Sequence, residues 1–167
     1  SLGRESEEGL AVTGGKAYLK GKNAPGPNLA LMGEMDALPI PSHVDANPET
    51  GASHCCGHNA QLTGIMGAAL ALADPEVKAA LGGNVTFFAV PAEEFVELEL
   101  KDKMREDGVI RYGGGKCELI RIGALANLDL VVGPPSGPPP PLSVTHGSTN
   151  RFVNKMLPLD GQAAPPP

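Results

Sequence analysis

The chain has 167 residues, of which 41% are hydrophobic and 19% charged, and its formal net charge is −6. This composition fits a globular domain with a hydrophobic core, and the negative charge argues against a nucleic-acid or anionic-membrane surface. No apolar run approaches the roughly 20 residues that span a bilayer, and we expect no secretory signal at the N-terminus. Three cysteines cannot all pair within one chain, so we expect free thiols and a cytoplasmic protein.

The first third of the chain predicts a hairpin followed by a buried strand. Residues 10–20 indicate two short strands that meet at a glycine pair. The next apolar run predicts a buried strand over residues 29–35, which ends close to Asp36. Residues 41–53 have the composition of a loop.

A helix over residues 60–73 is the clearest prediction, because apolar residues recur there at the spacing of one helix face. Asn59 is the expected cap at its start. The stripe consists of Leu62, Ile65, Met66, Ala69, Leu70 and Ala73. A second, short helix is predicted over residues 75–81, which begin with a proline.

Strands and helices alternate along the rest of the chain. Residues 84–90 are rich in β-branched and aromatic side chains and predict a central strand. Helices are predicted over 94–107 and 116–125, a third buried strand over 128–133, and one more strand within 145–159. This alternation predicts an α/β domain with a largely parallel sheet.

Two cysteines and two histidines lie within residues 54–58, directly before the predicted helix. A buried cysteine beside a hydrogen-bonded histidine is common in protein cores, and this alternative stays open for Cys56 and His58. A structural zinc site is less consistent, since no second Cys/His pair has zinc-finger spacing. The position favours a functional metal, because ligands of open α/β sheets gather at the carboxyl ends of strands.

Glu93 and Glu94 directly follow the predicted strand 84–90. Two adjacent carboxylates after a buried strand are costly to desolvate unless they face cations. The alternative is an exposed, acidic helix start that the helix dipole favours. With a thiolate and an imidazole nearby, one glutamate can bind a metal while the other is a general base on metal-bound water. The donor set favours zinc, or else manganese or cobalt.

With these motifs the sequence resembles the amidohydrolase branch of the dinuclear metallopeptidase and aminoacylase family. That branch includes hippurate hydrolases, aminobenzoyl-glutamate hydrolases and indole-acetyl-amino-acid hydrolases. The matching stretches lie in the family's order between residues 29 and about 164: GEMDALPI, SHCCGHNAQLTGIMGAALAL, VTFFAVPAEE, GGKCELIRIGAL and RFVNKMLPLDGQAA.

The resemblance implies an α/β/α sandwich with a mostly parallel central sheet. Residues 1–144 would form the N-terminal part of the catalytic domain, and residues 145–167 the start of a smaller inserted α+β lid or dimerisation domain. It also implies a homodimer at full length and hydrolysis of the amide bond of N-acyl amino acids or small dipeptide-like substrates.

The same resemblance assigns roles to single residues. Cys56, His58 and Glu94 match metal ligands, and Glu93 matches the general base. The family holds two divalent ions, which would be zinc, manganese or cobalt. Asp36 and His54 would lie beside the ligands, His54 as a hydrogen-bond donor.

Departures from the family pattern leave two alternatives open. Pro135 stands where the family usually has a histidine ligand, and the family continues beyond the segment that ends at Pro167. An inactive fragment or homologue that keeps the fold is therefore possible, and we expect these 167 residues alone to show no hydrolysis. A non-catalytic binding module that uses the proline-rich segment 133–141 is the other alternative.

Overall fold

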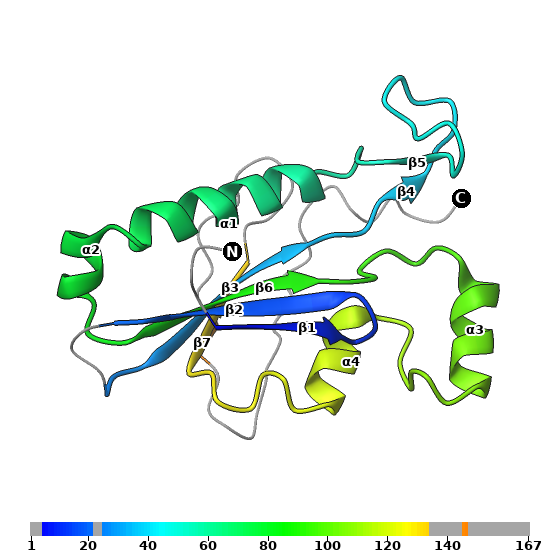
Figure 1. Ribbon diagram of the computed structural model, residues 1–167. Coiled ribbons are helices and arrows are strands. Elements are labelled where there is room, and N and C mark those ends of the chain that lie inside the picture. The colour runs from blue at the N-terminus through cyan, green and yellow to red at the C-terminus, as the bar shows by residue number, and fades with distance from the viewer. Residues whose placement is uncertain (1–4, 22–24, 134–144, 147–167) are drawn as a thin grey trace.

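The computed structural model describes residues 5–21, 25–133 and 145–146, and its centre is a six-stranded mixed sheet (Figure 1). The strand order is β1-β2-β6-β3-β7-β8. The strands are β1 (Ser6–Leu10), β2 (Gly14–Lys20), β3 (Asn28–Glu34), β6 (Asn84–Val90), β7 (Leu130–Val132) and β8 (Thr145–His146). The predicted buried strands β3, β6 and β7 pair in parallel, whereas β1, β2 and β8 join antiparallel. The α/β class is thus confirmed, with antiparallel pairs at both edges.

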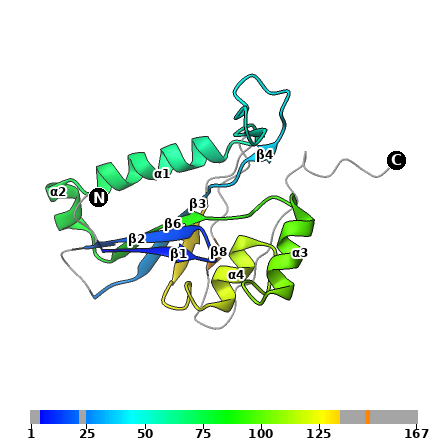
Figure 2. The same cartoon turned by 45° about the vertical axis from the view of Figure 1, so that its right-hand side comes forward.

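Helices cover both faces of this sheet. In Figures 1 and 2, α1 lies over one face and α4 lies against the other. The helices are α1 (His58–Leu72), α2 (Pro75–Ala80), α3 (Leu98–Glu106) and α4 (Gly115–Arg121). Two short antiparallel strands, β4 (Leu38–Pro39) and β5 (Ala52–Ser53), flank the loop before α1. None of the helices in the described ranges is long and apolar enough to cross a membrane.

The alternation of side chains along the strands divides the core into two clusters. One cluster faces α1, and the other faces α4 and the turn that follows it. The first contains Leu19, Val85 and Phe87 packed against Leu29, Leu31, Ile65, Ala69 and Leu72. The second contains Ala30, Met32, Phe88, Val90, Leu119, Leu125 and Leu128. The central strands thus bury both faces, as the predicted α/β/α sandwich requires.

The helix predicted over 60–73 is α1, but two details of the prediction are wrong. The cap is Gly57, whose φ of 105° turns the chain into the helix, and not Asn59. Met66 and Leu70 are 67% and 59% exposed, because the face on the sheet is centred on Ile65 and Ala69. The apolar stripe is therefore wider than the buried face.

The other predicted elements are present with shifted bounds. The hairpin turn lies at residues 11–13, so the glycine pair begins β2 instead of forming the turn. The helices predicted over 75–81, 94–107 and 116–125 correspond to the shorter α2, α3 and α4. Of the strand predicted within 145–159, the two residues of β8 are described. Most of segment 133–141 and of the proposed second domain lie outside the described residues, and the domain boundary stays a prediction.

Candidate metal centre

The carboxyl ends of two parallel strands and the first turn of α1 meet at one edge of the sheet. Strands β3 and β6 pair in register, with Glu34 opposite Val90, so the residues after both strands lie side by side. Helix α1 lies close to β3, because Gly33 has no side chain there. A Cβ at this position would lie 2.7 Å from the Ile65 Cδ1 atom. This packing brings His58 to the strand ends.

His58 is the centre of the cluster, and its side chain is only 2% exposed. Its Nδ1 atom lies 2.9 Å from the Asp36 carbonyl oxygen. A carbonyl oxygen can only accept a hydrogen bond, so Nδ1 carries a proton and donates it. The Nε2 atom faces carboxylate oxygens of Glu34, Glu93 and Glu94 at 3.0, 3.7 and 3.9 Å. In this tautomer the Nε2 atom carries a lone pair, which can bind a metal ion.

Ligand-type atoms converge around His58 from three segments of the chain. The ligand atoms of Cys56, His58 and Glu94 lie within 4.8 Å of one another, and so do those of Glu34, His58 and Glu93. Two atoms bound to one first-row ion at about 2.0–2.3 Å are at most about 4.6 Å apart. Both sets therefore have the spacing of metal ligands to within a few tenths of an ångström.

Two carboxylate oxygen atoms of this cluster lack a hydrogen-bond donor. Asp36 Oδ1 and Glu94 Oε1 are buried without a hydrogen-bond partner. Asp36 Oδ1 lies 3.2 Å from His58 Nδ1, but that nitrogen already donates to the Asp36 carbonyl group. Buried acceptors without a donor are rare and destabilising, and a cation bound by Glu94 would satisfy its Oε1 atom. The residues present therefore fit a divalent metal ion.

The acidic surroundings shift the pKa values of two of these groups. A hydrogen bond to Glu94, burial and the nearby carboxylates raise the pKa of the Cys56 thiol to about 12. The thiol must lose this proton to bind a metal, so binding of a cation and release of the proton are coupled. Burial, and then the charge of Glu34, raise the pKa of the Glu93 carboxyl group, which brings it closer to the neutral range suited to a general base.

The backbone around the two glutamates is held in a defined position. Ala92 has a φ of 52°, a left-handed conformation that few non-glycine residues adopt. The Glu94 backbone N–H donates to Asp36 Oδ2 at 2.8 Å. The Lys101 ammonium group of α3 donates to the Glu94 carbonyl oxygen at 2.6 Å. Asp36 thus orients both His58 and Glu94.

The structure brings together most of the residues that the sequence singled out. Cys56, His58, Glu93 and Glu94 converge, and Asp36 contacts two of them. His54 is exposed, and its proposed hydrogen bond to the cluster is absent from the contacts within the described ranges. Pro135 lies outside the described residues, and the roles of the converging residues stay predictions.

Three residues of the cluster were not predicted from the sequence: Glu34, Gln61 and Lys116. Gln61 donates to Glu34 Oε2 at 3.0 Å, and the Glu34 backbone N–H donates back to Gln61 Oε1 at 3.0 Å. Lys116 forms an ion pair with Glu34 Oε1. Glu34 could have been predicted from the sequence, because it is the last residue of the strand that leads to Asp36. Lys116 lies 82 positions further along the chain, and no local pattern marks it.

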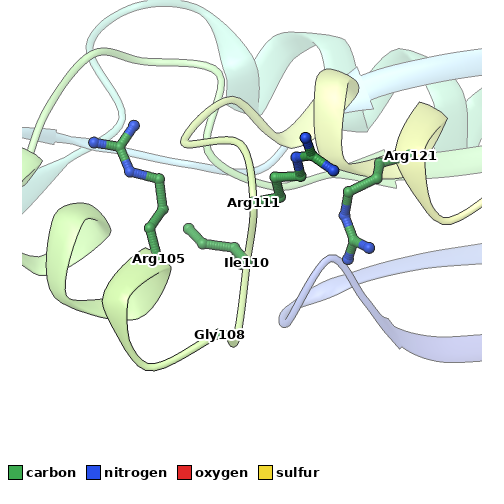
Figure 3. Close-up of a pocket in the computed structure, with 5 residues that line it drawn as sticks. All are labelled: Arg105, Gly108, Ile110, Arg111 and Arg121. Atoms are coloured by element: carbon green, nitrogen blue, oxygen red, sulfur yellow. The ribbon is translucent and has the colours of Figure 1, made fainter.

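A separate hollow of about 310 Å³ lies between α3 and α4 (Figure 3). It is lined by Arg105, Gly108, Ile110, Arg111 and Arg121. Figure 3 shows that the three guanidinium groups point in different directions. Two of them already form ion pairs, Arg105 with Asp102 and Arg121 with Glu118. None of these five lining residues is a usual metal ligand.

A three-layer α/β domain that gathers a thiol, an imidazole and carboxylates at the ends of its parallel strands has the form of a metal-dependent enzyme domain. Residues 30–143 match the model of peptidase family M20/M25/M40. The chain belongs to this family, as the resemblance of its motifs indicated.

Curated relatives of the chain are hydrolases by name. It is 38% identical over 105 residues to the IAA-amino acid hydrolase ILR1-like 2 of Arabidopsis thaliana, covering 61% of this chain and 23% of the relative. It is 31% identical over 136 residues to thermostable carboxypeptidase 2 of Saccharolobus solfataricus, covering 79% and 30%. It is 38% identical over 85 residues to the N-acetylcysteine deacetylase of Bacillus subtilis, covering 49% and 22%.

A solved structure agrees with this assignment. The Bacillus subtilis YXEP protein, described as a dinuclear metal binding peptidase from the M20 family, superposes with a TM-score of 0.59 at 27% identity. The match covers 79% of this chain and 32% of that protein. The chain therefore spans about a third or less of the length of these relatives.

Proposed function

We propose that the protein is a metal-dependent amidohydrolase that cleaves the amide bond of N-acyl amino acids or small dipeptide-like substrates. The observation that carries this proposal is the convergence of the Cys56, His58 and Glu94 ligand atoms within 4.8 Å, with Glu93 beside them. Relatives named as an IAA-amino acid hydrolase, a carboxypeptidase and a deacetylase support the reaction class.

Cys56, His58 and Glu94 would hold a divalent cation. A sulfur and an imidazole ligand favour zinc, and the surrounding carboxylates also suit manganese or cobalt. When bound, the ion would polarise the substrate carbonyl group and lower the pKa of a water molecule. Because a solved relative is described as dinuclear, we propose a second ion in the complete protein.

Glu93 would move the proton of the reaction. Its carboxylate would take a proton from the attacking water and deliver it to the leaving amine. The raised pKa of Glu93 supports this role, since a base with an ordinary glutamate pKa binds a proton weakly near neutral pH. Asp36 would hold His58 through Nδ1 and Glu94 through its backbone N–H, which orients both ligands.

We further propose a cytoplasmic homodimer, with residues 1–144 in the catalytic domain and residues 145–167 at the start of an inserted domain. The three cysteines have free thiols, which is consistent with a reducing compartment. An inactive homologue is the second candidate. It is favoured by Pro135, which has no side chain able to bind a metal where the resemblance expects a histidine.

Metal binding can be tested on the 167-residue chain. Hydrolysis should be tested on a longer protein that matches its relatives in length. Cobalt titration of the 167-residue chain should produce a thiolate-to-metal absorption band that Cys56→Ala abolishes. The longer protein should hydrolyse N-acetyl and N-benzoyl amino acids until a chelator is added. Metal binding without hydrolysis in the longer protein would favour the inactive homologue, and no metal binding would refute the proposal.

A further inference from the structure

Lys116 brings a positive charge to the strand-end carboxylates of Glu34, Asp36, Glu93 and Glu94. Its ammonium group forms an ion pair with Glu34 Oε1, and no other lysine or arginine of the described ranges pairs with one of these four carboxylates. The Glu34 side chain is only 12% exposed, so its charge needs a cationic partner. The Lys116 side chain is 44% exposed, so a substitution there changes the charge of the site without opening the core.

The start of α4 holds Lys116 beside these carboxylates. The Gly115 backbone N–H donates to the Ala92 carbonyl oxygen at 3.0 Å, which fixes the first turn of α4 against the residue that precedes Glu93. Burial and the charge of Glu34 raise the pKa of Glu93, and the charge of Lys116 lowers it, so Lys116 acts on both glutamates. The position of this ammonium group is therefore built into the fold.

The two groups of ligand-type atoms at the strand ends share one nitrogen atom. One group is Cys56, His58 and Glu94, and the other is Glu34, His58 and Glu93. His58 Nδ1 donates to a carbonyl oxygen, so Nε2 carries the only lone pair of the ring, and one lone pair binds one ion. When the first group holds an ion, the second group keeps only its two carboxylates, and Lys116 already pairs with one of them. The ammonium group would repel a divalent ion at that position.

We propose that Lys116 is a resident cation of the site, which neutralises Glu34 and competes with a second divalent ion for this carboxylate. The inference rests on the proposed function, in which Cys56, His58 and Glu94 hold the first ion. The 167-residue chain should therefore bind one divalent ion, and a second ion much more weakly. The second ion that we propose for the complete protein would have to displace Lys116 from Glu34.

Calorimetric titration of the 167-residue chain with Mn²⁺ tests the proposal, because it measures the number of bound ions and the affinity of each. Wild type should bind one ion. Lys116→Met should strengthen the binding of a second ion by about 10-fold or more, the effect of removing one charge roughly 5 Å from a divalent ion in a solvated site. Lys116→Arg keeps the charge and should behave like wild type. Circular dichroism checks that each variant is folded.

Lys103→Met is the matched control for the change in net charge. The Lys103 side chain is 69% exposed on α3 and pairs with Asp107, so its removal should change the affinity for a second ion by less than about threefold. An equal gain in Lys103→Met, no gain in Lys116→Met, or two ions bound equally tightly by wild type would each overturn the inference. In these three cases the ion bound by wild type would leave the proposed function intact. No ion bound by wild type would refute both.

Discussion

Glu118 and Glu94 are both acidic residues withdrawn from solvent, but their carboxylates differ in whether they have hydrogen-bond partners. Glu118 is 2% exposed and accepts hydrogen bonds from the backbone N–H groups of Arg111 and Tyr112 and from the Arg121 side chain. Glu94 has one buried oxygen without any hydrogen-bond partner. The first carboxylate finds its hydrogen-bond partners within the fold, whereas the Oε1 atom of the second has no partner among the described residues. A buried acid with all its partners stabilises the chain, whereas one without them points to a ligand.

The acidic residues of the two regions also differ in the direction of their pKa shifts. The Arg121 side chain, and then the Tyr112 and Arg111 backbone groups, hold the pKa of Glu118 below its ordinary value. Burial and the charge of Glu34 raise the pKa of Glu93. The α4 region therefore stabilises a negative charge, and the strand-end cluster opposes one. This contrast separates a structural anchor from a candidate catalytic site.

The largest expected effect is on catalysis in the strand-end cluster. Glu93→Gln in the protein at the length of its relatives should lower kcat for N-acyl amino acid hydrolysis by about 10²- to 10⁴-fold, because the amide cannot accept the proton of the attacking water. Metal affinity, measured by calorimetry, should stay close to wild type. A variant that keeps full activity would show that Glu93 is not the base.

The stability of the metal-free chain should depend on Glu118 and not on Glu94. Glu118→Gln should lower the free energy of unfolding by about 2–3 kcal/mol, because charge-assisted hydrogen bonds to two backbone N–H groups are weakened in a buried place. Glu94→Gln should leave the metal-free chain as stable as wild type or more stable, because a negative charge is removed from among other carboxylates. Urea denaturation of both variants without metal checks this. A Glu94→Gln loss as large as that of Glu118→Gln would remove the distinction between the two regions.

The pH dependence of stability should carry opposite signs in the two regions. The lowered pKa of Glu118 means that its contribution is present above its ordinary value of 4.5 and is lost as the pH falls through the folded-state pKa. The raised pKa of Glu93 means that its contribution is present below 4.5 and is lost as the pH rises through the folded-state pKa. Urea denaturation at a series of pH values measures both effects. Compared with wild type, Glu118→Gln should lose less free energy of unfolding at acid pH, and Glu93→Gln should lose less of it as the pH rises above 4.5. An unchanged pH profile in both variants would contradict the assigned shifts.

Two glycines extend the comparison to the backbone, where the smallest effects are expected. A Cβ at Gly115 would lie 1.6 Å from the Pro91 carbonyl oxygen, so Gly115→Ala must separate α4 from the loop that carries Glu93. We expect a loss of about 1–3 kcal/mol, as for other overpacked positions, together with weaker metal binding. Gly64→Ala is the matched control. Nothing lies within 4 Å of a Cβ there, and a stabilisation of about 0.5–1 kcal/mol should follow from the better helix propensity of alanine. Thermal unfolding measures both effects, and a stable Gly115→Ala variant with full metal affinity would show that this close contact is dispensable.

Local patterns in the sequence determined the main elements and more than half of the site. The apolar runs of β3 and β6 and the striped helix α1 follow from strand and helix periodicity, which depends only on neighbours along the chain. Cys56, His58, Glu93 and Glu94 were predictable because each follows or precedes such an element, where parallel strand ends gather ligands. The edge strands were less predictable, since the direction in which β1, β2 and β8 pair depends on their turns and partners.

Tertiary structure alone decided how these residues are held. The contact of Glu34 with Gln61 joins residues 27 positions apart, that of Asp36 with Glu94 joins residues 58 apart, and that of Glu34 with Lys116 joins residues 82 apart. The anchoring of Glu118 by Arg111, Tyr112 and Arg121 depends on the turn before α4 folding back onto that helix. The exposure of Met66 and Leu70 has the same origin, since the rotation of α1 on the sheet is set by Gly33 and Ile65. Periodicity along the chain predicts which residues reach the sheet edge, but only the packing of helices on the sheet determines which polar groups meet there and which stay without a partner.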